Sequence, residues 1–163
     1  MCIVLIAGFC RRLIWAITGF SVAHSVTLGL AALDIVVLPV PVIEAVIALS
    51  IVFMAWEIVR RNTTTLTYRH PVFVSAGFGL LHGFGFAAVL TEIGLPKGES
   101  LLALLCFNIG VEIGQLLFIM ALLLGFNVIK KLRFLPLDVL KQVITYAIGS
   151  LATLWVIERV LLF

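Results

Sequence analysis

Long apolar runs, separated by short polar or proline-containing stretches, make up most of this chain. A helix needs about 20 apolar residues to cross a bilayer, and runs of that length recur along the sequence. Proline and basic residues mark their limits, since proline is tolerated in the first turn of a helix, where its missing N–H is not needed. The pattern predicts five full membrane spans, over residues 13–33, 40–59, 71–92, 101–126 and 137–157.

The first ten residues are also apolar, but as a helix they reach only about 15 Å, roughly half the hydrocarbon thickness. A signal peptide is disfavoured because Arg11 and Arg12 follow this stretch instead of preceding it. We interpret it as a half-span, or as the end of a helix whose beginning is missing. The predicted fold class is therefore all-α: a polytopic transmembrane helix bundle, one domain over residues 1–163, with five full spans plus a short N-terminal half-span.

Composition agrees with a membrane protein. The chain is 63% hydrophobic and 12% charged, whereas a soluble domain is about half apolar and a quarter charged. The cysteines are odd in number and form no CxxC pair, so they indicate neither a disulfide framework nor a thiolate zinc site. Neither HExxH nor GxSxG occurs, and we expect no enzymatic activity and no tightly bound cofactor.

The basic residues are distributed unevenly between the two sides of the predicted bundle. If the spans alternate in direction, only Lys97 and Arg159 fall on one side, and all other basic residues fall on the opposite side. The positive-inside rule predicts that this second side, with the connectors 60–70 and 127–136, is cytoplasmic. We expect a bacterial inner-membrane protein. The net charge of +3 then reflects topology, and no nucleic-acid partner is expected.

Three ionisable residues lie at the centres of predicted spans: His24, His82 and Glu112. A charged group at the centre of a bilayer costs about 2.5–3.5 kcal/mol by insertion scales, so such groups face the bundle interior and find partners there. Because all three lie at one depth, the sequence predicts a shared site. The alternative is that each histidine only forms a hydrogen bond between helices.

Other polar and small residues surround these three. Asn108 and Gln115 share a helix face with Glu112, at spacings i, i+4 and i+7. Glycine costs about 1 kcal/mol against alanine within a helix, so the glycine-rich run around His82, residues 77–88, predicts close backbone approach. Gly110 and Gly114 likewise predict a closely packed neighbouring helix.

Two further glutamates lie nearer the ends of the predicted spans. Glu44 is a candidate for the entry of a pathway, although it also lies in a first helical turn, where the helix dipole favours an anion. Glu57 is expected to be solvated beside Arg60 and Arg61.

Four strings resemble the motifs of the HupE/UreJ family of small membrane proteins, in the expected order: SVAHSVTL (21–28), IEAVIALSI (43–51), GFGLLHGFGFA (77–87) and FNIGVEIGQL (107–116). The family is associated with nickel supply to hydrogenase and urease, and its members are regarded as permeases for nickel or related divalent metals. The resemblance implies metal ligands at His24, His82 and Glu112, with Glu44, Asn108 and Gln115 as pathway or second-shell residues.

The chemistry of these residues agrees with such a role. Neutral imidazole suits nickel, a carboxylate compensates charge, and a permease needs weak binding so that the ion can leave. Family members usually begin with a helix carrying Gly-x-Asp-His or His-x5-Asp-His, and this sequence contains neither. A shortened reading frame and a divergent member that has lost a ligand are the two interpretations.

Three function classes follow. The first is a permease for a divalent metal, most plausibly nickel, which is cargo and not a resident cofactor. The second is a non-transporting accessory or structural subunit of a larger membrane complex, with a homo-oligomer also open. The third is a haem protein with His24 and His82 as axial ligands, which leaves Glu112 unexplained. Membrane lipid is the expected surrounding in each case.

Overall fold

The computed structural model describes residues 11–36, 38–60, 64–93, 100–132 and 136–162. Within these residues every regular element is a helix, which confirms the all-α fold class. The helices are α2 (Arg11–Ala32), α3 (Val40–Arg60), α4 (Leu66–Arg69), α5 (Pro71–Ile93), α6 (Ser100–Leu132) and α7 (Leu137–Val160). The predicted half-span over residues 1–10 lies outside the described residues.

The long helices coincide with the predicted apolar spans. Four of the described helices contain stretches that are long and apolar enough to cross a membrane: Arg11–Ala32, Val40–Arg60, Leu102–Ile129 and Asp138–Val160. Within the part of α5 whose side chains the structure describes, the apolar stretch is Pro71–Phe86, and the helix itself continues to Ile93. The chain is thus a helical membrane protein, with four of the predicted spans meeting the length and hydropathy criterion among the described residues.

Two connectors differ from the prediction. Residues 127–132 belong to α6, which continues for six residues beyond its predicted end. The segment contains lysine, leucine and isoleucine and no proline before Pro136, so the helix does not stop where the apolar sequence does. The connector 60–70 contains one helical turn, α4.

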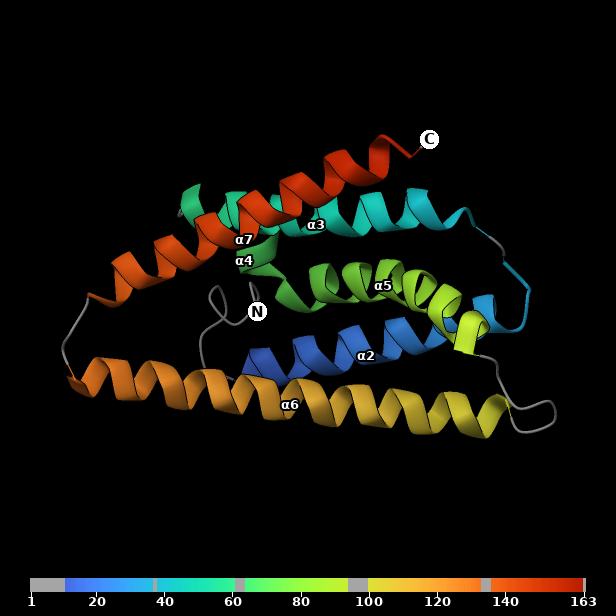
Figure 1. The fold of residues 1–163 in the computed structure, drawn as a ribbon. Coiled ribbons are helices and arrows are strands. Elements are labelled where there is room, and N and C mark those ends of the chain that lie inside the picture. Colours follow the sequence, from blue (N-terminus) through green and yellow to red (C-terminus); the bar gives the residue numbers. More distant parts are fainter. Residues whose placement is uncertain (1–10, 37, 61–63, 94–99, 133–135, 163) are drawn as a thin grey trace.

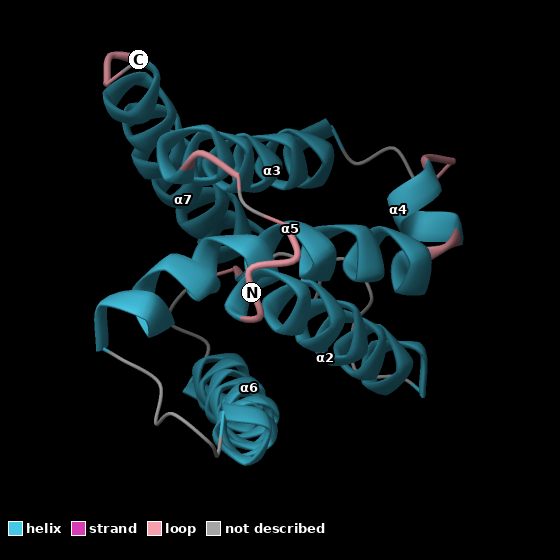
Figure 2. Cartoon of the chain, turned by 90° about the vertical axis from the view of Figure 1, so that its right-hand side faces the viewer, coloured by secondary structure: helices cyan, strands magenta, loops and turns pink. Residues whose placement is uncertain are grey.

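The long helices run along a common direction, so the molecule is an elongated bundle (Figure 1). Figure 2, a view along the bundle, shows α3 beside α7 and α2 beside α5, with α6 on the far side of α2. Glu44 and Arg159 form an ion pair of 3.1 Å between the start of α3 and the end of α7. These two helices are therefore antiparallel, as an alternating topology requires.

One end of the bundle collects basic residues. Arg11 begins α2, Arg60 ends α3, Arg69 ends α4 and Lys131 lies in the last turn of α6. The beginning of α2 and the ends of α3 and α6 face the left-hand side of Figure 1. We call this the basic end, and the opposite one, which carries the Glu44–Arg159 pair, the far end.

Small residues bring α5 against α2. Ser75, Gly79 and Gly83 are spaced by four residues, and Ser75 Oγ donates a hydrogen bond of 2.7 Å to the carbonyl of Ala16. A Cβ atom at Gly79 would collide with the backbone of Phe20, and one at Gly83 would collide with Thr27 and with the carbonyl of His24. The close backbone approach predicted for this run is therefore present. At successive contacts the residue numbers increase in the same direction along both helices, so α2 and α5 are parallel.

The two glycines of α6, Gly110 and Gly114, differ from those of α5 in their surroundings. A Cβ at Gly110 or Gly114 would have no described neighbour within 4 Å. The close neighbour expected there is not found in the described part of the chain, because these glycines lie on the outward surface of α6, where the residues are exposed.

This contrast supplies a stability prediction. We expect Gly79→Ala and Gly83→Ala to destabilise the folded protein by about 1–3 kcal/mol each, because overpacking forces helices apart. Thermal unfolding of the detergent-solubilised protein measures the effect. Gly110→Ala and Gly114→Ala are the matched controls and should leave the unfolding temperature unchanged or slightly raised. Equal destabilisation by all four substitutions would contradict the assignment of the α2–α5 contact.

Candidate functional site

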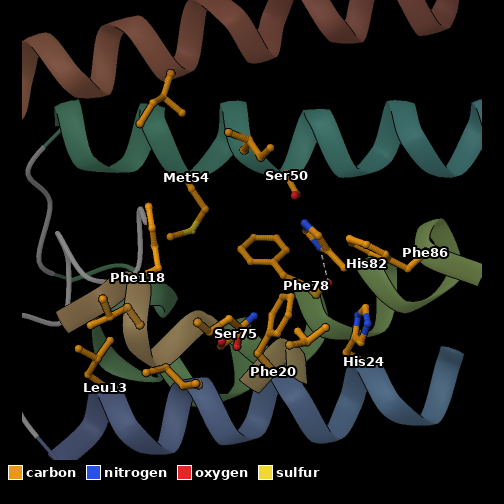
Figure 3. A pocket seen from close by; sticks show the side chains of 16 residues that line it. Leu13, Phe20, His24, Ser50, Met54, Ser75, Phe78, His82, Phe86 and Phe118 are labelled. Carbon is orange, nitrogen blue, oxygen red and sulfur yellow. Dashed lines mark hydrogen bonds between the residues drawn. The ribbon is translucent and has the colours of Figure 1, made fainter. Parts of the chain in front are cut away.

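A cavity of about 490 Å³ lies between the five long helices. Each of them contributes to its wall (Figure 3). Most of the lining is apolar or aromatic, and the polar side chains among it are His24, Ser50, Ser75, His82 and Gln115. A largely apolar cavity with a few converging polar groups is the usual form of a small-ligand site.

The hydroxyl groups of the two serines each donate a hydrogen bond to a backbone carbonyl. Ser75 Oγ donates to Ala16, as described above, and Ser50 Oγ donates to the carbonyl of Ile47 at 2.6 Å. Their oxygens can still accept a hydrogen bond, and the other polar side chains of the lining are His24, His82 and Gln115.

His82 presents one ring nitrogen to a ligand. Its Nδ1 lies 2.7 Å from the carbonyl oxygen of Phe78, one turn earlier in α5. Because a carbonyl only accepts, Nδ1 carries the hydrogen and donates it. In the neutral ring Nε2 then holds a lone pair, which is the arrangement of a metal-binding histidine whose second nitrogen is fixed by a backbone carbonyl.

His24 is buried, with 1% of its surface exposed, and neither ring nitrogen has a hydrogen-bond partner among the described residues. Its imidazole stacks on Phe20, with centroids 5.9 Å apart, and meets Phe86 edge-on at 5.6 Å. The ring of Phe20 also contacts that of His82, at 5.3 Å. Burying unpaired polar atoms is costly, and His24 is therefore an unusual buried side chain, packed between aromatic rings with no described partner for either nitrogen.

The three residues of the polar face predicted on α6 have different surroundings in the structure. Gln115 lines the cavity, and its Oε1 is buried without a described partner. Asn108 donates from Nδ2 to the carbonyl of Leu104 at 3.0 Å, within its own helix. Glu112 is half-buried and is not among the cavity residues.

The structure therefore brings His24, His82 and Gln115 to one cavity, without Glu112. No three histidine, cysteine, aspartate or glutamate side chains within the described ranges group closely enough to hold a metal ion. The three-member set of His24, His82 and Glu112 stays a prediction.

The family model described as "HupE / UreJ protein" matches residues 1–159, nearly the whole chain. The chain belongs to the HupE/UreJ family. No curated protein and no solved structure gave a significant match.

Glu44 of this HupE/UreJ chain has a partner, because its carboxylate pairs with Arg159 and both side chains are under a third exposed. The pair accounts for Glu44 as a contact between α3 and α7. Its predicted place at a pathway entry stays a prediction.

Glu57 corrects the sequence interpretation. It is 3% exposed, whereas solvation was expected. Arg60 lies over the ring of Trp56, with its Cζ atom 5.0 Å from the centroid, on the outward side of α3. The side chain of Glu57 points instead toward the interior, so proximity to basic residues in the sequence did not indicate exposure.

The contacts of aromatic rings with the two histidines of the HupE/UreJ chain were not predicted from the sequence. Phe20 precedes His24 by four residues, and Phe86 follows His82 by four. That spacing places each pair on one helix face and was the available signal, but phenylalanine is common in apolar spans and alone indicates no site.

Proposed function

We propose that this HupE/UreJ chain is a membrane permease for a divalent transition-metal ion, with nickel as the expected cargo, and that its path passes His24 and His82. The single observation that carries the proposal is the state of His24. An imidazole that is almost fully buried, with no described partner for either nitrogen, lines a cavity shared by all five long helices.

The chemistry of the cavity supports transit more than tight binding. Two neutral imidazoles suit nickel, cobalt, zinc or copper, and the amide oxygen of Gln115 adds a weak ligand. A structural metal site would have three or four strong ligands and would release its ion slowly. We assign charge compensation to Glu112, which lies three residues from Gln115 on α6.

We further propose that all five long helices span the bacterial inner membrane with the basic end in the cytoplasm. The positive-inside rule and the antiparallel contact of α3 with α7 support this orientation. Asp34 lies in the turn after α2, and Thr64 lies between α3 and α4.

Cysteine labelling tests the topology. In a chain whose native cysteines are replaced by serine, we expect Thr64→Cys to react with an impermeant thiol reagent only from the cytoplasmic side, and Asp34→Cys only from the opposite side. Reaction of both positions from the same side would refute the alternating arrangement.

Transport is tested by radioactive nickel accumulation in cells that produce the chain, compared with cells carrying an empty vector. We expect higher accumulation in the first, and loss of the difference in a His24→Ala, His82→Ala double variant at matched membrane abundance. Equal accumulation in all three would reject transport by this chain alone and would favour the accessory-subunit function.

A further inference from the structure

We propose that Phe86 and Phe107 form the gate that closes the cavity toward the far end of the bundle, with Phe86 as the moving ring and Phe107 as the surface against which it closes. The inference rests on the proposed permeation path. It adds to that path two residues that do not bind the ion but control its access to His24.

The two ends of the cavity differ. His24, His82 and Phe86 lie at one end of it, and Leu13, Met54 and Phe118 at the other (Figure 3). Leu13 is two residues from the start of α2, at the basic end, whereas His24 lies past the middle of that helix. The cavity therefore extends from the histidines toward the basic end.

Beyond the histidines, helix contacts close the bundle on two sides. Gly83 of α5 lies against Thr27 and the carbonyl of His24, so no space remains between α5 and α2. At Gly85 a Cβ would lie 2.6 Å from Ile47 Cδ1, so the side chain of Ile47 fills the space between α3 and α5 there. Among the boundaries of α5 with the long helices that line the cavity, the one with α6 is left.

At that boundary two aromatic rings meet. The centroids of Phe86 on α5 and Phe107 on α6 are 5.9 Å apart, with the ring planes inclined by 52°. Phe86 also contacts His24 at 5.6 Å, on the side opposite Phe20. An ion that passes between α5 and α6 on its way between His24 and the far end would meet this pair, and apolar rings oppose the passage of a hydrated ion.

The two rings are held differently. Phe107 packs against the buried cluster of Leu28 and Leu104, which joins α2 to α6. Phe86 is 44% exposed, and its described ring contacts are those with His24 and Phe107. Its ring therefore has room to rotate that the packed ring of Phe107 lacks. Rotation of Phe86 about its side-chain bonds would separate it from Phe107 and uncover His24 in one movement.

The test measures access to Ser50, which lines the cavity from α3, whereas the two gate residues belong to α5 and α6. The probe is an impermeant thiol reagent applied to either side of oriented membrane vesicles that contain Ser50→Cys in a chain whose other cysteines are replaced by serine. We expect labelling from the basic side and protection from the far side. Phe86→Ala and Phe107→Ala should each abolish that protection.

Phe118→Ala is the matched control, because Phe118 lines the same cavity near the basic end; it should leave far-side protection intact. Phe86→Leu, which keeps an apolar side chain, provides a second variant if the alanine substitution prevents folding, and it should give partial access. Far-side labelling of the intact gate, or full protection in the folded Phe86 and Phe107 variants, would overturn the proposal. Labelling needs no metal, so a failure of nickel accumulation would reject the permease and leave the gate result standing.

Discussion

Replacing His82 by alanine is expected to abolish metal uptake while the protein remains folded and inserted. The substitution removes the Nε2 lone pair that faces the cavity, and loss of groups that merely support a metal ligand already costs about 10–100-fold in affinity. We therefore expect nickel binding by the purified protein to weaken by roughly 100-fold or more, and accumulation in cells to fall to the level of the empty vector.

His70→Ala is the control for this experiment. His70 is an exposed residue between α4 and α5, outside the cavity, so its replacement should leave binding and uptake unchanged. If His82→Ala keeps the binding and uptake of the unaltered chain, then His82 serves only to bond the carbonyl of Phe78, and the proposed path past the two histidines is wrong.

Replacing Glu112 by glutamine is the second substitution with a large expected effect. Glutamine has the size of glutamate and can still form hydrogen bonds, through one acceptor oxygen and an NH2 donor group, but it carries no charge. A divalent ion among neutral ligands retains its full charge, which is expensive in an apolar environment. We expect nickel uptake to be lost in Glu112→Gln, with membrane abundance and unfolding temperature near those of the unaltered chain.

Glu158→Gln controls for the loss of one negative charge, because Glu158 is exposed near the end of α7. It should transport normally. Persistent uptake in Glu112→Gln would show that Glu112 connects helices through hydrogen bonds, and the oxygen ligand Gln115 would then be the main partner of the histidines on α6.

The helices were predictable because their cause is local. Apolar runs of about 20 residues limited by proline and charge need no knowledge of neighbours, and they located α2, α3, α5 and α7 to within a few residues. The position of His24 and His82 in one cavity was also predictable, since both lie at one depth and α5 carries glycines that let it approach α2. The end of α6 was not, because apolar character ends near residue 126 whereas helix propensity continues to Leu132.

The orientation of side chains around the bundle was harder to predict. Spacing puts Asn108, Glu112 and Gln115 on one broad face, but only the packing of α6 against α2 decides which of them reaches the cavity. Glu57 shows the same limit, since the rotation of α3 buries it while Arg60 turns to Trp56. Helix rotation and partner choice depend on contacts between distant segments, which the sequence of one chain does not display.

The most direct test of the proposed function is ion flux through the purified chain reconstituted into liposomes that enclose a nickel-sensitive dye. The proposal predicts a dye response on addition of external nickel that exceeds that of protein-free liposomes and disappears in the His24→Ala, His82→Ala double variant. A response in the double variant equal to that of the unaltered chain, or no response from the correctly folded unaltered chain, would contradict a permeation path past these histidines.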